Sequence, residues 1–152
     1  MQITLQGTYG TYSFDPQDAG CRLGQGGMGI VFKGDHTNNS GPVAIKVLYK
    51  EITANISAIE RERQSAGIRI NNRNLIRMLD FVEQNGIFHI VSELVEGKTL
   101  HAHLQELQLA NKKMDKTAAL NIINQVMDGL SALHGNQPPV IHRDIDPSNI
   151  ML

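Results

Sequence analysis

The residues best suited to chemistry are concentrated in the segment Val140–Leu152, which reads V-I-H-R-D-I-D-P-S-N-I-M-L. Asp144 can act as a general base, and the amide oxygen of Asn149 is a ligand type that hard cations accept. Apolar residues flank the polar ones, so Val140-Ile141 and Ile150–Leu152 are predicted to be short buried strands that anchor a tight loop. A plain polar turn between two strands is the alternative, and the case for chemistry depends on the upstream sequence.

A glycine-rich hairpin is predicted over Arg22–Lys33, which reads R-L-G-Q-G-G-M-G-I-V-F-K. Its β-branched and aromatic flanks favour strands, and glycines at the tip let backbone N–H groups approach a ligand closely. A flap over phosphates is the functional interpretation. A flexible hairpin loop is the alternative, because a lone G-x-G-x-x-G pattern is a weak signal. The strand-like Ile30–Phe32 disfavours a dinucleotide site, which needs a helix directly after the last glycine.

A lysine lies inside the apolar strand predicted at Val43–Tyr49. Lysine is seldom buried without a partner, so Lys46 must either reach solvent or meet an anion. An edge-strand lysine that discourages aggregation is the alternative. The following segment, Ile52–Ile70, has the three-and-four apolar spacing of a helix, with Glu62 on its apolar side. Glu62 is therefore the predicted ion-pair partner of Lys46, and Glu60 is the second choice.

The chain changes character after its first ninety or so residues. Strands are predicted at Leu75–Val82 and Ile87–Leu94, because an Asn-Gly pair between them is a strong hairpin signal. Beyond them the sequence is helical. Thr99–Leu109 is predicted to be a short helix, and Asp115 is a suitable N-cap for a longer one over Lys116–His134. A strand-rich part with one helix therefore precedes a helical part.

Composition limits the classes of protein to consider. The 152 residues suit one ordinary domain, and 41% hydrophobic with 19% charged residues indicates a globular chain. A net charge of −1 gives no reason to expect a nucleic-acid partner. The single cysteine, Cys21, fits a reducing compartment; Met1–Gly10 lacks the pattern of a secretory signal, and no stretch approaches the roughly 20 apolar residues of a membrane span. We expect a cytoplasmic protein without a membrane segment, and the sequence leaves the oligomeric state open.

Three of these motifs occur together in the order typical of protein kinases. Gly24–Val31 matches G-x-G-x-x-G-x-V, Val43–Lys46 is V-A-I-K, and His142–Asn149 matches H-R-D-x-x-x-x-N. From about Tyr12 onward the chain resembles the eukaryotic-like serine/threonine protein kinases that are common in bacteria. The resemblance implies an α+β, protein-kinase-like fold: an N-lobe antiparallel sheet of about five strands with one helix, followed by the start of a helical C-lobe.

The same resemblance implies a domain organisation. Residues 1–12 would be a lead-in, residues 13–95 the kinase N-lobe, and residues 96–152 the beginning of the C-lobe up to the catalytic loop. The expected cofactors are ATP and Mg²⁺, and the expected partner is a protein substrate with a Ser or Thr hydroxyl that receives the γ-phosphate.

Individual roles follow from the family's motifs. By resemblance, Lys46 would hold the α- and β-phosphates and be steadied by Glu62, although the helix glutamate is one residue farther from the next strand than is usual. Asp144 would accept or orient the hydroxyl proton, and Asn149 would ligate one magnesium ion. The remaining nucleotide contacts would be the flap, the adenine pocket with its gatekeeper Ser92, and the hinge: Leu23, Gly24, Gln25, Gly26, Gly27, Met28, Gly29, Val31, Ala44, Ser92, Glu93, Val95 and Met151.

Two departures from the family pattern affect the expected activity. Asp146 stands where serine/threonine kinases usually have a lysine that neutralises the γ-phosphate, and an anion there should weaken transition-state stabilisation. The printed sequence ends at Leu152, before any D-F-G segment, so we expect the 152-residue chain alone to be inactive. Two alternatives therefore stand beside the kinase: a nucleotide- or partner-binding pseudokinase fragment without transfer activity, and a small-molecule phosphotransferase of the same fold.

Overall fold

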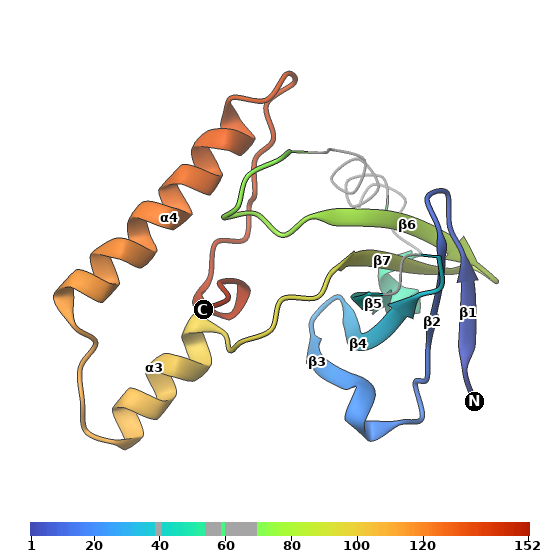
Figure 1. Cartoon of the computed structure of the whole chain (residues 1–152), viewed down its shortest axis with the longest axis horizontal. Coiled ribbons are helices and arrows are strands. Elements are labelled where there is room, and N and C mark those ends of the chain that lie inside the picture. Colours follow the sequence, from blue (N-terminus) through green and yellow to red (C-terminus); the bar gives the residue numbers. More distant parts are fainter. Residues whose placement is uncertain (39–40, 54–58, 60–69) are drawn as a thin grey trace. The chain divides into compact units, whose positions relative to one another are not determined.

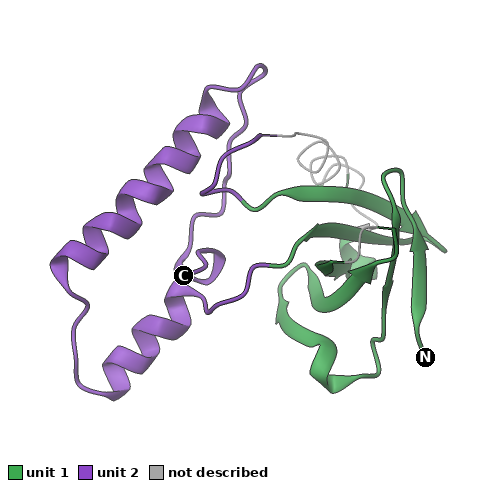
Figure 2. Cartoon of the chain, viewed as in Figure 1, with its two compact units in different colours: residues 1–69, 76–94 green, residues 70–75, 95–152 purple. Residues whose placement is uncertain are grey.

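The chain divides into two compact units (Figure 2). The computed structural model describes residues 1–38, 41–53, 59 and 70–152. The first unit, here called the sheet unit, comprises Met1–Arg69 and Ile76–Leu94. The second, the helical unit, comprises Ile70–Leu75 and Val95–Leu152.

An antiparallel sheet of seven strands forms the sheet unit (Figure 1). The strands are β1 (Ile3–Gln6), β2 (Thr11–Phe14), β3 (Arg22–Gly26), β4 (Gly29–His36), β5 (Pro42–Leu48), β6 (Met78–Gln84) and β7 (Ile87–Glu93). They are ordered β1-β2-β4-β5-β7-β6, and β3 also pairs with β4. The five predicted strands correspond to β3–β7. Asn85 and Gly86 join β6 to β7 with positive φ angles of 54° and 72°, as the Asn-Gly signal predicts.

The hairpin β1–β2 is a finding that the sequence did not predict. We expected residues 1–12 to be a lead-in, yet Leu5 and Tyr12 are 0% and 1% exposed and belong to the core. Asp80 on β6 fixes this hairpin: its Oδ2 accepts hydrogen bonds from Tyr9 N at 2.8 Å and from the Tyr12 hydroxyl at 3.2 Å. Only glycine fits at Gly7, because a Cβ there would lie 2.2 Å from Asp80 Oδ2.

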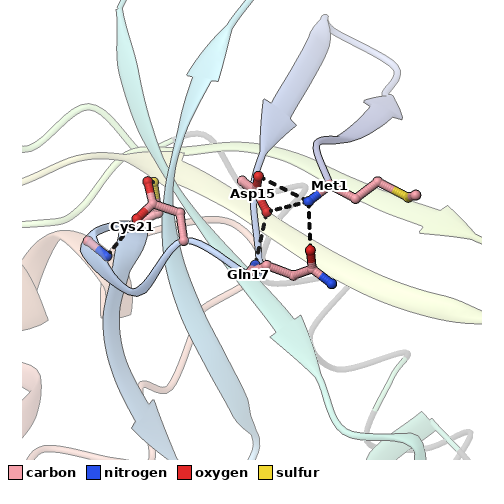
Figure 3. Close-up of polar contacts among 6 residues, drawn as sticks. Met1, Asp15, Gln17 and Cys21 are labelled. Carbon is pink, nitrogen blue, oxygen red and sulfur yellow. Dashed lines mark hydrogen bonds and ion pairs between the residues drawn. The ribbon is translucent and has the colours of Figure 1, made fainter.

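The open end of this hairpin is held by the chain's own N-terminus (Figure 3). The Met1 ammonium donates to both carboxylate oxygens of Asp15, at 3.0 and 3.1 Å, and to Gln17 Oε1 at 3.0 Å. The backbone N–H of Gln17 and the Met1 ammonium hold the pKa of Asp15 below its usual value. Asp15 therefore stays charged at neutral pH and fastens the start of β1 to the turn after β2.

The sheet has two faces, and each carries its own apolar cluster. Because side chains alternate along a strand, β5 directs Ile45 to one face and Lys46 to the other. The Ile45 side, called the hairpin face, packs beneath β1–β2, and its buried cluster is Leu5, Tyr12, Phe14, Phe32, Val43, Ile45, Val82 and Val91. The Lys46 side, called the lysine face, carries the buried cluster Leu48, Ile59 and Ile90.

Helix α1 (Lys50–Thr53) begins two residues before the helix predicted at Ile52–Ile70. Ile59 is 8% exposed and packs in the lysine-face cluster, on the apolar stripe predicted for that helix. The other residues of the segment, 54–58 and 60–69, lie outside the described residues. Glu62 and Glu60 are among them, so the ion pair with Lys46 stays a prediction.

The helical unit contains both helices predicted for the second part of the chain. Helix α3 (Leu100–Leu109) is capped by Thr99, whose Oγ1 accepts from Ala102 N at 3.1 Å. Helix α4 (Lys116–His134) is capped by Asp115, whose Oδ2 accepts from Ala118 N at 3.0 Å. The apolar stripe of α4 is open to solvent, with Leu120, Ile123 and Met127 50%, 56% and 59% exposed.

The predicted strands around the polar loop are wrong. Val140-Ile141 is not a strand, and Ile141 is 62% exposed rather than buried. Val140 donates its N–H to Leu133 O at 3.0 Å, so the backbone here completes the end of α4 and has no strand neighbour. In Ile150–Leu152, only Met151 pairs, through an isolated antiparallel bridge to Thr99.

Candidate active site

The glycine-rich hairpin is present as predicted, with β3 and β4 joined by a tight turn at Gly27-Met28. Gly29 is required by packing, since a Cβ there would lie 2.1 Å from the backbone oxygen of Val47. At Gly24, Gly26 and Gly27 an added Cβ would meet no heavy atom within 4 Å. None of these three has a positive φ. Packing and backbone geometry therefore do not explain them, and their open surroundings are compatible with the predicted close approach of a ligand to the backbone.

The predicted nucleotide contacts on β4, β5 and β7 share the lysine face. Val31 pairs with Lys46, and Ala44 pairs with Ser92, and directly paired residues of antiparallel strands point to the same side. Leu23 lies where β3 shifts register against β4 and is 48% exposed. Strand pairing thus places Val31, Ala44, Lys46 and the predicted gatekeeper Ser92 on one surface of the sheet unit.

Lys46 is half-buried and has no carboxylate within 4.0 Å among the residues that the structure describes. Its Nζ approaches Met28 Sδ at 3.9 Å, which is a weak contact for an ammonium group. A partly desolvated cation of this kind gains free energy from an anion. The flap residue Met28 lies beside it, so an anion at Lys46 would also be next to the flap.

The two backbone N–H groups of the predicted hinge, those of Glu93 and Val95, differ in their hydrogen bonding. Glu93 donates its N–H to Arg77 O at 3.0 Å, and its Oε1 accepts from Arg77 N at 2.7 Å. This N–H is therefore not available to a ligand. Val95 belongs to the helical unit and makes no hydrogen bond to any described residue through its N–H. Of the two, only Val95 can offer a backbone donor to a nucleotide base.

The loop after α4 brings the predicted acid and amide together. Asn149 Nδ2 donates to Asp144 Oδ2 at 2.9 Å and to Asp144 O at 3.1 Å. Arg143, between His142 and Asp144, has a φ of 66°, a left-handed conformation that is uncommon for residues other than glycine. Strained backbone of this kind is concentrated at functional sites. The amide oxygen of Asn149 and the carboxylate of Asp144 are the hard donors that Mg²⁺ prefers, so these residues fit a magnesium ion.

Asp146 has a local role that the sequence analysis missed. Its Oδ1 accepts from Ser148 N at 2.8 Å and from the Ser148 hydroxyl, which caps the short helix η2 (Pro147–Asn149). These two hydrogen bonds hold the pKa of Asp146 below its usual value. The signal was in the sequence: an Asp followed by Pro at the first helical position is typical of a helix N-terminus.

The end of the loop is fixed to the start of α3. Leu100 N donates to Ile150 O at 2.8 Å, and Leu152 N donates to Lys98 O at 2.9 Å. Gly97 has a φ of 146°, and a Cβ there would lie 2.1 Å from Leu152 O, so only glycine allows this approach. Met151, the predicted lower contact of the adenine, is half-buried within this pairing.

Two further properties concern the described part of the chain. It contains no group of three or more His, Cys, Asp or Glu side chains arranged to hold a metal ion. None of its helices has the length and hydropathy needed to cross a membrane.

Comparison with known proteins decides the family. The family model described as protein kinase domain matches residues 18–152. The chain belongs to the protein kinase family. PrkC, a serine/threonine-protein kinase of Bacillus subtilis, is 35% identical over 133 residues, and pkn2, a serine/threonine-protein kinase of Myxococcus xanthus, is 33% identical over 132 residues. The resemblance inferred from the motifs is thus confirmed.

Solved kinase structures agree with the fold. The PknI kinase domain of Mycobacterium tuberculosis superimposes with a TM-score of 0.74 and 25% identity. The match covers 86% of this chain and 53% of that one. The predicted α+β kinase-like fold with an antiparallel N-lobe sheet is therefore confirmed. The chain spans only 19% of PrkC and 15% of pkn2.

Proposed function

We propose that this chain supplies the nucleotide-binding lobe and the catalytic loop of a cytoplasmic serine/threonine protein kinase. The observation that carries the proposal is the arrangement on the lysine face, where half-buried Lys46 lies beside the flap residue Met28 and the tip glycines of the flap have no internal packing role. In this assignment the N-lobe comprises residues 13–95, and residues 96–152 begin the C-lobe. The reaction transfers the γ-phosphate of ATP to a Ser or Thr hydroxyl of a protein.

Each side chain has a defined task in this proposal. Lys46 binds the α- and β-phosphates, and the backbone of Gly24–Gly29 covers them. Val31 and Ala44 contact the adenine, and the Val95 N–H donates to it. These assignments use only groups that the described structure leaves available on the lysine face or in the segment after β7.

The catalytic loop handles the hydroxyl and the metal. Asp144 orients the substrate hydroxyl and takes its proton, for which an exposed carboxylate is suited. Magnesium, when bound, neutralises charge that develops on the phosphates. Asn149 would hold it through its amide oxygen, because the amide nitrogen already donates to Asp144. Convergence of Lys46, Asp144 and Asn149 on one ATP is part of the proposal.

Nucleotide binding by the 152-residue chain is the first test. A fluorescent ATP analogue is titrated into the wild type and Lys46→Met, with Lys113→Met, an exposed lysine between α3 and α4, as control. Loss of charge-assisted hydrogen bonds to phosphate should weaken binding by roughly tenfold to a hundredfold in Lys46→Met. Equal affinities in Lys46→Met and the wild type would remove Lys46 from its assigned role.

Transfer is tested separately in a longer protein, in which a D-F-G segment and the rest of a kinase C-lobe follow this chain, with radiolabelled ATP and casein as a generic protein substrate. The expected result is magnesium-dependent labelling that Asp144→Asn abolishes while leaving nucleotide affinity within about twofold, because Asp144 acts on the hydroxyl and not on ATP. Labelling that persists in Asp144→Asn would contradict the role of Asp144. Tight ATP binding without any labelling would favour the pseudokinase alternative.

That second candidate, a nucleotide-binding protein without transfer activity, is favoured by Asp146. Asp146→Asn removes the anion but keeps a good helix cap, whereas Asp146→Ala removes both. If the anion repels the γ-phosphate, both variants and Asp146→Lys should bind the ATP analogue more tightly than the wild type. If only the cap matters, Asp146→Asn should match the wild type and Asp146→Ala should bind more weakly.

A further inference from the structure

Met28 stands at the tip of the glycine-rich flap, yet its side chain is half-buried, whereas the neighbouring Gly26 and Gly27 are exposed. Its carbonyl oxygen accepts a hydrogen bond from Tyr49 N at 3.0 Å, which fastens the tip to the residue after β5. The side chain packs against the lysine-face cluster. The backbone hydrogen bond and the apolar packing together hold the Met28 sulfur at a defined place on the lysine face.

The sulfur of Met28 lies 3.9 Å from Lys46 Nζ. A thioether is only a weak acceptor, so this contact contributes little as it stands. An oxygen atom bonded to the sulfur would change that, because oxidation to the sulfoxide makes the side chain polar and gives it a strong acceptor. The 3.9 Å separation leaves room for such an oxygen to lie about 2.8–3.0 Å from Nζ, which is the length of an N–H···O hydrogen bond.

Hydrogen peroxide supplies such an oxygen to methionine. A sulfur lone pair attacks one peroxide oxygen and forms the S–O bond, the O–O bond breaks, and the second oxygen leaves as hydroxide, which takes the proton of the first and becomes water. The sulfur is oxidised by two electrons, and the peroxide is reduced by the same two. The half-buried Met28 side chain is open enough for a molecule of this size to reach it, and methionine sulfoxide reductases reverse the reaction.

We propose that Met28 is a redox-sensitive modification site, where a peroxide forms a sulfoxide whose oxygen hydrogen-bonds the Lys46 ammonium and competes with the phosphates of ATP. This inference rests on the proposed function, in which Lys46 binds those phosphates. Oxidation lowers the affinity of the chain for ATP, and reduction restores it. Met127 is 59% exposed and so is open to the same oxidant, but it lies on α4 in the helical unit and therefore serves as the control.

The first test measures affinity for the fluorescent ATP analogue before and after peroxide treatment of the wild type, Met28→Leu and Met127→Leu, each compared with its own untreated form. We expect treatment to weaken binding roughly fivefold to tenfold in the wild type and in Met127→Leu, since one charge-assisted hydrogen bond to Lys46 must be displaced. In Met28→Leu the loss should stay below about twofold, because leucine has no sulfur to oxidise. The two methionine sulfoxide reductases, one for each epimer, should restore the wild-type affinity.

A second measurement needs no nucleotide and so separates this inference from the proposed function. The chain is labelled with ¹³C-lysine, peptide mass spectrometry confirms the sulfoxide at Met28, and NMR follows the ε-methylene signal of Lys46. Oxidation should shift this signal in the wild type and leave it in place in Met28→Leu. An untreated chain that binds no ATP analogue would contradict the proposed function, and the Lys46 signal would still test the sulfoxide contact. An unmoved Lys46 signal beside a Met28 sulfoxide would overturn that contact.

Met28→Gln imitates the sulfoxide permanently, since glutamine has a similar length and ends in a carbonyl oxygen that accepts from an ammonium group. This variant should bind the ATP analogue roughly fivefold more weakly than Met28→Leu, and peroxide should not weaken it further. The comparison does not depend on how completely peroxide oxidises a half-buried side chain. Equal affinities of the two variants, equal losses on oxidation in the wild type and Met28→Leu, or a folded wild type in which peroxide leaves Met28 unoxidised would overturn the proposal.

Discussion

The sheet unit and the helical unit hold their functional side chains by different means. Lys46 and Ala44 lie on a strand that is paired on both sides, so backbone ladders and side-chain alternation fix their direction. Asp144 and Asn149 lie on an irregular loop, and they are fixed by hydrogen bonds between their own groups. The first arrangement follows from a repeating pattern, whereas the second depends on a few individual contacts.

The two units also differ in how much apolar surface they bury. In the sheet unit Ile45 and Val91 are 0% exposed and Leu48 is 2% exposed. In α4 the buried residue is a glycine, Gly129, while Ile123 on the apolar stripe is 56% exposed. Burial of apolar area is the main favourable term in folding. The sheet unit therefore carries most of the stability that the described chain can supply.

The largest effect is expected when an isoleucine is replaced by alanine in the sheet unit, and the same substitution in the helical unit provides the comparison. Ile45→Ala should lower the free energy of unfolding by about 2–5 kcal/mol, because it leaves a cavity in a closed core. Ile123→Ala should change it by no more than about 0.5 kcal/mol, because the side chain is mostly in solvent. Urea unfolding followed by far-UV circular dichroism is a suitable measurement, since it reports on the strands of the sheet unit and on the helices of the helical unit, whereas all 3 tyrosines lie in the sheet unit.

Similar losses at both positions would break the comparison. They would mean that the α4 stripe is covered in solution. Size-exclusion chromatography of the wild type at several concentrations then distinguishes self-association, which depends on concentration, from folding within one chain.

A smaller effect is expected at the contact that attaches the β1–β2 hairpin. Asp80 is 3% exposed and accepts from Tyr9 N and the Tyr12 hydroxyl through one oxygen and from Phe81 N at 2.9 Å through the other. Asp80→Asn replaces one acceptor with an NH₂ group that faces donors. We expect a loss of about 1–3 kcal/mol in unfolding free energy and faster hydrogen exchange at the Tyr9 amide.

Glu83→Gln is the control for this variant, because it makes the same chemical change at an exposed position of the same strand. It should be nearly neutral. Unchanged exchange at Tyr9 in Asp80→Asn would show that the hairpin does not depend on this carboxylate.

Sequence reasoning succeeded where periodicity and motif spacing were strong. The strands β4, β5 and β7, the cap at Asp115 and the Asn-Gly turn all follow from local rules, since alternation and capping depend on neighbouring residues. The face shared by Lys46 and Ala44 follows from the same alternation, since they are two residues apart on β5. In each case the neighbouring residues alone were enough to predict the feature that the structure shows.

It failed where long-range contacts decide the outcome. The strands β1 and β2 have four residues each, too few for a clear pattern, and their burial depends on Asp80, which is 68 residues from Tyr12. Val140-Ile141 has the composition of a strand but no neighbouring strand to pair with. The cap formed by Asp146 is a different case, because it is a local contact with Ser148 and was predictable from the Asp-Pro-Ser sequence.

The smallest expected effect concerns a polar contact in the helical unit, where the apolar stripe of α4 is open to solvent. Asp128 Oδ2 on α4 accepts from Asn72 Nδ2 at 2.9 Å and from Asn74 Nδ2 at 2.8 Å, which fastens the segment 70–75 to the helix. The hydrogen bond from Asn72 and then that from Asn74 hold the pKa of Asp128 below its usual value. Because the folded-state pKa is depressed, the contact stabilises the unit above the usual aspartate pKa and loses this contribution as the pH falls through the lowered value.

NMR titration measures this window directly. The side-chain NH₂ signals of Asn72 and Asn74 should move together with the carboxyl carbon of Asp128, at a pH below the ordinary aspartate range. Replacing both asparagines by serine should return the pKa of Asp128 toward its usual value, and Asp128→Asn should abolish the transition. If the amide signals do not respond to the carboxyl titration, the hydrogen bonds to Asp128 do not hold the segment 70–75. Its attachment to α4 would then depend on the packing of Asn74 and Leu75 near Gly129.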